Sequence, residues 1–175
     1  MKQKALVVGL GASGEACSRF LLKRDWSVIS TDTRQRPPAL SRLNGVQGFE
    51  FCSLDEALNK LGGVELLVMS PGISPWHSAV TPLVQKALSM GIEMVGEIEL
   101  FARELNRLEE LRGYKPKVIA ITGTNGKTTT TVLTTKMAAA GFRPRPQGLL
   151  LQSPESYAPL HGRTLHRERL TASRP

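Results

Sequence analysis

Short runs of apolar residues alternate along the first half of the chain with segments in which apolar residues recur every three or four positions. An unbroken apolar run that ends at glycine, serine or proline is typical of a buried parallel strand, and the longer spacing is typical of a helix. Strands are therefore predicted at residues 4–9, Trp26–Thr31, Leu66–Met69 and Glu93–Val95. Helices are predicted at Ser13–Arg24, Leu54–Leu61, Thr81–Met90 and Glu97–Leu111, and Ser53 is expected to cap the second of them.

This order of elements predicts the α/β class. The alternation of strands and helices favours a doubly wound, Rossmann-like parallel sheet for a first domain at residues 1–95. After a linker at Arg112–Pro116, the apolar run Val118–Thr122 predicts another strand, and a helix is expected at Lys127–Ala140. Residues 96–142 are thus predicted to be the incomplete start of a second α/β domain.

Residues 143–175 differ in character from the rest of the chain. They contain five prolines, six leucines and six arginines but no valine or isoleucine, and they show no helical or strand period. We expect a disordered tail or a non-native translation of the gene, such as a frameshift. An irregular but genuine segment is the alternative.

The charge and cysteine content narrow the function class. The chain has 175 residues and a net charge of +8, of which +4 comes from residues 143–175. The other +4 is spread without a basic helix face, which argues against nucleic-acid binding. No apolar run approaches the roughly 20 residues of a membrane span, and no signal-peptide pattern is present. Cys17 and Cys52 are interpreted as reduced, buried thiols of a cytoplasmic protein.

The segment Gly9-Leu10-Gly11-Ala12-Ser13-Gly14 directly follows the first predicted strand. A GxGxxG segment between a strand and a helix usually holds the pyrophosphate of a dinucleotide or nucleotide-sugar. Gly9 suits the tight turn, Gly11 the approach of backbone N–H groups to a phosphate, and Gly14 the close packing of helix on strand. Ser13 is expected to cap the helix and to donate to a phosphate oxygen. A glycine turn that only packs is the plain alternative.

Two further polar segments follow predicted strands. Asp32 lies where nicotinamide-dependent enzymes carry a ribose-binding acid, so an NAD-binding interpretation is open at this point. Thr33 and Arg34 offer additional polar contacts, and these argue against an NAD-binding site. Ser70-Pro71-Gly72-Ile73 follows another strand, and ligands of open sheets bind beyond the carboxyl ends of the strands. Both segments are therefore predicted to reach the ligand of the glycine loop, with a plain turn as the alternative for the second.

A second glycine loop follows the run Val118–Thr122. Gly126-Lys127-Thr128 offers backbone N–H groups, an ammonium for the outer phosphates of ATP and a hydroxyl for Mg²⁺. The loop is shorter than the common GxxxxGK[ST] form, because Ile121 stands where that form has its first glycine. The residues predicted to bind ATP are Gly123, Thr124, Asn125, Gly126, Lys127, Thr128 and Thr129. A chain with both loops is expected to bring a nucleotide-linked substrate to an ATP-driven step.

With both loops placed, the chain resembles the Mur ligases, and within them the branch that adds D-glutamate during peptidoglycan synthesis. The match covers residues 4 to about 142. It rests on Gly9-Leu10-Gly11 with Gly14, Asp32-Thr33-Arg34, Ser70-Pro71-Gly72-Ile73, Gly96-Glu97-Ile98-Glu99-Leu100-Phe101 and Gly123-Thr124-Asn125-Gly126-Lys127-Thr128-Thr129. The ATP loop alone is shared by all Mur ligases and by folylpolyglutamate synthases, so the N-terminal segments support the narrower match.

The resemblance implies a cytoplasmic, three-domain enzyme whose N-terminal domain binds the UDP of UDP-N-acetylmuramoyl-L-alanine. It implies that Gly11, Ala12 and Ser13 lie along the diphosphate and that Asp32, Thr33 and Arg34 contact the uridine part. Ser70, Gly72 and Ile73 would line the UDP-sugar site. In the central P-loop ATPase domain, Lys127 and Thr128 would be the catalytic residues, and Thr128 would bind Mg²⁺.

The implied reaction is an ATP-dependent amide-bond formation. ATP phosphorylates the alanyl carboxylate, and the amine of D-glutamate then attacks the acyl phosphate. The D-glutamate pocket and the family's other metal ligands have no match in this chain, so the resemblance implies an N-terminal fragment that is inactive alone. Another Mur ligase, a nicotinamide-dependent oxidoreductase and a non-catalytic UDP-sugar-binding module are the alternatives.

Overall fold

The computed structural model describes residues 2–141, which form two compact units that divide between Lys117 and Val118. The predicted tail at residues 143–175 lies outside the described residues. By compactness, the first unit includes the helix Glu97–Arg112. The domain boundary that the sequence analysis places at residue 95 stays a prediction about the organisation of the whole protein.

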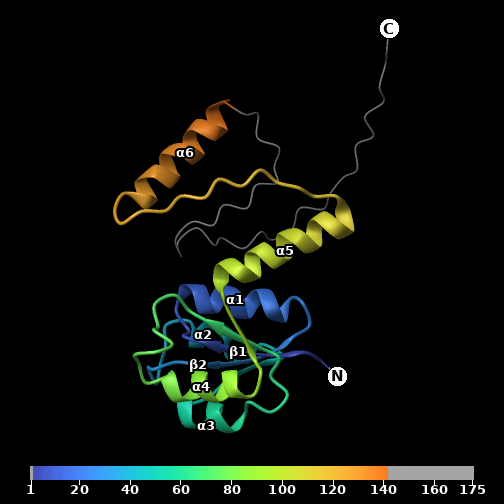
Figure 1. The fold of residues 1–175 in the computed structure, drawn as a ribbon, viewed down its shortest axis with the longest axis vertical. Coiled ribbons are helices and arrows are strands. Elements are labelled where there is room, and N and C mark those ends of the chain that lie inside the picture. The colour runs from blue at the N-terminus through green and yellow to red at the C-terminus, as the bar shows by residue number, and fades with distance from the viewer. Residues whose placement is uncertain (1, 142–175) are drawn as a thin grey trace. The chain divides into compact units, whose positions relative to one another are not determined.

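The first unit is built on one parallel sheet (Figure 1). Its strands are β1 (Lys4–Val8), β2 (Ser27–Thr31), β3 (Phe49–Phe51), β4 (Leu66–Met69) and β5 (Glu93–Gly96), in the spatial order β3-β2-β1-β4-β5. All four neighbouring pairs are parallel. The predicted doubly wound parallel sheet is thus confirmed, and the predicted strands are correct to within one residue at each end. Strand β3, which the sequence analysis does not predict, adds an edge to the sheet.

Five helices belong to the first unit: α1 (Ala12–Leu22), α2 (Leu40–Leu43), α3 (Leu54–Asn59), α4 (Thr81–Ser89) and α5 (Glu97–Arg112). Successive side chains of a strand point to opposite faces of the sheet. Leu6 and Val8 therefore pack with residues of α3 and α4, whereas Ala5 and Val7 pack with residues of α1 and α5. Figure 1 shows α1 on one side of the strands and α3 and α4 on the other. The sheet is buried between two helical layers.

The start of α3 follows its sequence closely. The Ser53 hydroxyl accepts a hydrogen bond from the Glu56 backbone N–H at 3.3 Å, and the Glu56 carboxylate accepts one from the Ser53 backbone N–H at 2.9 Å. This reciprocal pair is a capping box, which satisfies two N–H groups that the helix leaves unpaired. The prediction that Ser53 caps this helix is confirmed.

The two cysteines lie in different cores of the first unit. Cys17 packs on the α1 side of the sheet and Cys52 on the α3 side, and both are free and buried. Burial, together with the negative charge of Glu97, raises the pKa of the Cys17 thiol to about 12. Burial also raises the pKa of Cys52. Thiols held in the protonated form are poor nucleophiles, so both cysteines act as small core residues.

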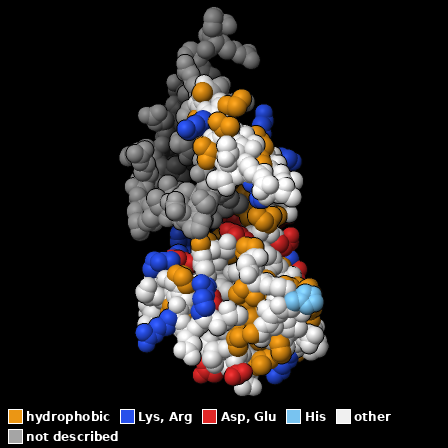
Figure 2. Space-filling model, turned by 90° about the vertical axis from the view of Figure 1, so that its left-hand side faces the viewer, with side chains coloured by type: hydrophobic (Ala, Val, Ile, Leu, Met, Phe, Trp, Pro, Cys, Tyr) orange, Lys and Arg blue, Asp and Glu red, His pale blue; other side chains and the backbone are white. Residues whose placement is uncertain are grey.

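The second unit contains one helix within the described residues, α6 (Lys127–Gly141), but the strand predicted at Val118–Thr122 is wrong. That segment is irregular, and the side chains of Val118 and Ile119 are 59% and 69% exposed. Figure 2 shows hydrophobic side chains at the surface of this unit. A strand is stable only when neighbouring strands bond to its backbone, and the described part of this unit supplies none.

None of the helices in the described range 2–141 is both long enough and apolar enough to cross a membrane.

Candidate functional site

The first glycine loop is fixed by close contacts. The Gly9 N–H donates to the Thr31 carbonyl at 2.8 Å, and the φ of Gly9 is +93°, in the region that favours glycine. A Cβ at Gly9 would lie 2.7 Å from Ile73 Cδ1 and 2.8 Å from Ser70 Cβ. A Cβ at Gly14 would lie 1.8 Å from the Gly9 carbonyl oxygen. Neither position has room for a side chain, so these two glycines let α1 lie directly on the end of β1.

Gly11 differs from its two neighbours in the motif. It is the N-cap of α1, with φ −85° and ψ −159°, and no atom of the described residues lies within 4 Å of the position of its missing Cβ. The prediction that Ser13 caps the helix is wrong, because the extended residue is Gly11 and Ser13 already lies in the first helical turn. No side-chain hydrogen bond caps α1. The first N–H groups of a helix have no partner within it, so this end of α1 is suited to bind an anion.

Asp32 lies beside the loop with its side chain wholly buried. Its Oδ2 accepts from the Leu10 backbone N–H at 2.6 Å and from Arg34 Nη2 at 2.8 Å. Its Oδ1 accepts from the Arg34 backbone N–H at 2.9 Å and from Arg34 Nε at 2.8 Å. Burial opposes ionisation of this carboxyl, but the hydrogen bonds from Arg34 and Leu10 outweigh that effect and lower the pKa of Asp32. The pKa of Arg34 is raised by the same pairing.

The segment after β4 holds the loop from its other side. The Ser70 hydroxyl donates to the Gly9 carbonyl at 2.7 Å, and the Ser70 N–H donates to the Val8 carbonyl at 2.9 Å. Ile73 is half-buried against Gly9, and Gly72 is exposed with open space around it. Since β1 is paired with both β2 and β4, the structure brings together the three segments that the sequence analysis selected: Gly11–Ser13, Asp32–Arg34 and Ser70–Ile73.

Two contributors to this site escaped the sequence analysis. Leu10 acts through its backbone N–H, and no residue type marks such a role. Thr31 ends β2 with its carbonyl on Gly9, and its buried hydroxyl has no hydrogen-bond partner among residues 2–141. The one feature of the sequence that pointed to Thr31 was its position directly before Asp32, a predicted site residue.

The second loop is exposed throughout, from Thr122 to Thr130. Gly123 and Gly126 have φ values of +150° and +75°. The Lys127 ammonium donates to the Gly123 carbonyl at 2.6 Å and to the Thr124 carbonyl at 3.4 Å. Helix α6 starts at Lys127, so its free N–H groups and this ammonium lie at the same loop.

This donor set suits a phosphate. Backbone N–H groups at a helix start and an adjacent ammonium are the elements that hold the outer phosphates of a nucleotide. For Mg²⁺ the loop offers the hydroxyl of Thr128, and residues 2–141 hold no cluster of three or more His, Cys, Asp or Glu side chains that could bind a metal.

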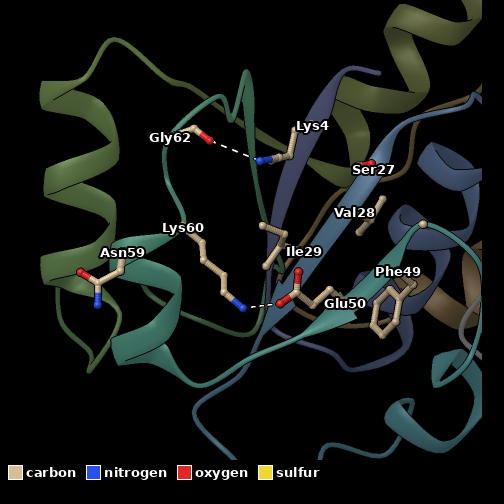
Figure 3. Close-up of a pocket in the computed structure, with 10 residues that line it drawn as sticks. Lys4, Ser27, Val28, Ile29, Phe49, Glu50, Asn59, Lys60 and Gly62 are labelled. Carbon is tan, nitrogen blue, oxygen red and sulfur yellow. Dashed lines mark hydrogen bonds and ion pairs between the residues drawn. The ribbon is translucent and has the colours of Figure 1, made fainter. Parts of the chain in front are cut away.

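A cavity of about 590 Å³ lies at the opposite end of the sheet, where β1, β2 and β3 begin (Figure 3). Lys4 Nζ donates to the Gly62 carbonyl at 3.3 Å, and Lys60 is paired with Glu50. None of the site residues predicted from the sequence lines this cavity. Its cations already have partners, and it takes no part in the site at the carboxyl ends of the strands.

Comparison with known proteins identifies the family. A family model described as "Mur ligase MurD-like, N-terminal domain" matches residues 3–96, more than half of the chain. The chain belongs to this family. The match spans the sheet and all three segments of the candidate site, and it ends at the last residue of β5.

Curated relatives carry the name UDP-N-acetylmuramoylalanine–D-glutamate ligase. The protein of Paraburkholderia phymatum is 48% identical over 136 residues, which cover 76% of this chain and 26% of that protein. The protein of Bordetella avium is 40% identical over 167 residues, which cover 89% of this chain and 32% of that protein. This MurD-like chain thus spans about a quarter to a third of the length of these relatives.

Among solved structures, one from Bacteroides thetaiotaomicron aligns with a TM-score of 0.40 and 14% identity, over 55% of this chain and 47% of that one. A likeness this weak supports no argument about function.

Proposed function

We propose that this chain is the UDP-substrate-binding part, with the first ATP-binding elements, of a ligase that adds D-glutamate to UDP-N-acetylmuramoyl-L-alanine. The observation that supports it is the convergence of Gly11–Ser13, Asp32–Arg34 and Ser70–Ile73 at one end of a MurD-like domain. The printed name of the relatives suggests the substrate and the amino acid. The enzyme acts in the cytoplasm, in peptidoglycan synthesis.

The proposed roles in substrate binding follow the geometry. Gly11, Ala12 and Ser13 offer the N–H groups at the start of α1 to the diphosphate, because Gly11 leaves that face open. The segment Asp32–Arg34 takes the uridine part, and Ser70, Gly72 and Ile73 form the wall on the far side of the loop.

The second loop is proposed to bind ATP. Gly123, Thr124, Asn125 and Gly126 surround the phosphates, while Lys127 neutralises their outer charge. Thr128 binds Mg²⁺, and Thr129 donates from the first turn of α6. ATP supplies the phosphoryl group that turns the alanyl carboxylate into a reactive acyl phosphate. Both partners of that step are anionic, so the positive charges of Lys127 and Mg²⁺ lower the repulsion between them.

We further propose that the 175-residue chain is catalytically inactive alone. Within residues 2–141, the loop proposed to bind ATP stands on an irregular segment, and the sequence carries no match for the family's D-glutamate pocket. Any ATP-dependent amide formation by the purified chain contradicts this proposal.

The competing interpretation, a nicotinamide-dependent enzyme, requires that Asp32 binds the ribose of the cofactor. A ribose-binding acid needs a lone pair free for a ribose hydroxyl, whereas all the acceptor sites of Asp32 are engaged. The geometry therefore favours the UDP-sugar over NAD. A MurD-like ligase that adds another amino acid stays compatible with this chain.

The test is a calorimetric titration of the chain with UDP-N-acetylmuramoyl-L-alanine, with NADH as the control ligand. We expect saturable binding of the UDP-sugar and none of NADH. NADH binding without UDP-sugar binding overturns the proposal in favour of an oxidoreductase. A matched variant, Gly11→Val, places a branched side chain on the open face of the loop and is expected to abolish UDP-sugar binding while the chain stays folded.

A further inference from the structure

The carboxylate of Asp32 has no capacity left for a ligand. An ionised carboxylate has about four lone-pair sites. All are used, by the Leu10 N–H, the Arg34 N–H, Arg34 Nε and Arg34 Nη2, at distances of 2.6–2.9 Å. The side chain is also 0% exposed. A ligand hydroxyl or N–H has neither a route to this carboxylate nor an acceptor site on it.

We propose that Asp32 is a positioning residue that holds two ligand-binding elements and does not itself touch the ligand. This inference rests on the proposed function and refines the role of the segment Asp32–Arg34 within it. Two features of the structure show which elements Asp32 holds: the glycine loop and the guanidinium of Arg34.

The first element is the glycine loop. The bond from Leu10 N–H to Asp32 Oδ2 is the shortest of the four and is assisted by the negative charge of the carboxylate. Leu10 is completely buried and directly precedes Gly11, the N-cap of α1. Asp32, which directly follows β2, therefore fixes the loop at the residue before Gly11.

The second element is Arg34. Two of its N–H groups form a bidentate pair with the carboxylate, which fixes the plane of the guanidinium. The Arg34 side chain is nevertheless 52% exposed, so the guanidinium still has N–H groups that solvent can reach. The buried Asp32 carboxylate orients the Arg34 guanidinium. The exposed guanidinium is the group that binds an anionic or carbonyl oxygen of the ligand.

The experiment uses ligand analogues that carry the same charge. Uridine diphosphate offers a carboxylate its uracil N3–H and its two ribose hydroxyls as donors. N3-methyl-UDP lacks the first, and 2′,3′-dideoxy-UDP lacks the others. Affinities of UDP and both analogues are measured by calorimetry for the full chain and its Asp32→Asn variant. Because the three probes have equal charge, the change of net charge in the variant cancels from the ratios between them.

We expect Asp32→Asn to change all three affinities by the same factor, to within about twofold. If Asp32 accepted a bond from the ligand, the wild-type chain would discriminate against one analogue by roughly tenfold or more, and the variant would lose that discrimination. Such a loss overturns the proposal.

Amide hydrogen exchange at Leu10 gives a second readout that does not depend on the ligand. We expect exchange at Leu10 to accelerate in Asp32→Asn and to stay slow in Arg34→Ala, since only the first variant alters the acceptor of that N–H. Unchanged exchange in Asp32→Asn overturns the proposal. If the Asp32→Asn variant does not fold, the same exchange measurement is made on the wild-type chain. The proposal requires that exchange at the Leu10 amide stays slow at saturating UDP. Fast exchange there would mean that the ligand displaces Leu10 from Asp32, and it would overturn the proposal.

A result that overturns the proposed function can be told apart from a result that overturns the role of Asp32. A wild-type chain that binds none of the three probes overturns the UDP site. Fast exchange at Leu10 in Asp32→Asn would still show that Asp32 holds the loop.

Discussion

The two glycine loops of this chain both lead into a helix, but the structure around them differs. The first follows β1, which pairs with a strand on each side and is almost fully buried from Ala5 to Val8. The second follows Val118–Thr122, which forms no strand within the described residues and is largely exposed. In the first loop, the atoms around Gly9 and Gly14 leave no room for a side chain, whereas no atom of residues 2–141 lies within 4 Å of the missing Cβ of Gly126.

This difference shows that a phosphate-loop motif specifies backbone angles but not the structure that holds them. Both loops contain a glycine with positive φ, at Gly9 and at Gly126, and both lead into a helix. The atoms of Ser70, Ile73 and Asp32 fix the first loop. In the second loop, the Lys127 ammonium donates hydrogen bonds to two carbonyls of the same loop, those of Gly123 and Thr124. A preformed site therefore needs a completed sheet around its motif.

The largest expected effect is that of Gly14→Ala. The added Cβ would lie 1.8 Å from the Gly9 carbonyl oxygen, and a backbone atom cannot move aside without separating α1 from β1. We expect a loss of more than about 4 kcal/mol in the free energy of unfolding, or no folded first unit. Urea denaturation followed by tryptophan fluorescence measures this, because both tryptophans, Trp26 and Trp76, belong to the first unit.

The matched control is Gly11→Ala, where the same Cβ meets open space at an ordinary φ. We expect a change below about 1 kcal/mol. Equal destabilisation by Gly11→Ala and Gly14→Ala contradicts the packing argument.

The next prediction compares one residue from each of the apolar runs that precede the two glycine loops. Leu6 is 1% exposed in β1, and Ile119 is 69% exposed in the second unit. Leu6→Ala should lower the free energy of unfolding by about 2–5 kcal/mol because it leaves a cavity. Ile119→Ala should change it by less than about 0.5 kcal/mol. Urea denaturation followed both by tryptophan fluorescence and by circular dichroism at a helix wavelength checks the two variants, and a large effect of Ile119→Ala on the circular dichroism transition would show that the second unit has a core of its own.

The third prediction concerns acid stability. The pKa of Asp32 is lowered in the folded state, so its stabilising contribution is present above its unfolded pKa of about 3.9 and is lost as the pH falls through the folded pKa. Asp32→Asn should cost about 1–3 kcal/mol at neutral pH because it removes the charge of a hydrogen-bond acceptor, and the difference from wild type should shrink as the pH falls below about 4. Urea midpoints at several pH values measure this.

Asp25→Asn is the control for that prediction. Asp25 is 91% exposed and pairs with Lys2 at the surface, so its replacement should change stability by less than about 0.5 kcal/mol at any pH. A pH-independent difference between wild type and Asp32→Asn would mean that the charge of Asp32 is unimportant.

The smallest effect compares two helix starts. Ser53→Ala removes the capping box of α3 and should cost about 1 kcal/mol. Thr124→Ala lies before α6, whose first turn carries no acidic residue, and should leave the tryptophan transition unchanged. Circular dichroism at a helix wavelength, measured beside fluorescence, separates a local loss of helix from unfolding of the first unit.

Much of the first unit could be predicted from local pattern. Leu66–Met69 is the predicted strand to the residue, and Ser53 caps its helix as expected. Strand β3 could not be predicted, because Phe49–Phe51 is three residues long and only its pairing with β2 makes it a strand. The cap of α1 was misplaced at Ser13, because a serine is a common cap, while here the backbone of Gly11 takes the extended conformation.

The candidate site divides in the same way. Motif spacing selected the three segments beyond β1, β2 and β4, and the pairing of these strands brings them together. It did not reveal that Asp32 faces inward, since a carboxylate at a strand end is equally consistent with a ligand contact. Only the tertiary structure shows that the carboxylate accepts bonds from Leu10 and Arg34, and the bond from Leu10 joins residues that lie 22 positions apart in the sequence.

By itself, the sequence determined the parallel α/β order of the first unit, the positions of four of its five strands and of its four longer helices, and which residues stand near the glycine loops. These follow from local periodicity and from glycine's conformational freedom. Only the tertiary structure decided which glycines are packed and which lie open, that Asp32 is saturated and buried, and that Val118–Thr122 does not form a strand. Those properties depend on atoms brought together from distant parts of the chain, and a strand without neighbours has nothing to complete its hydrogen bonds.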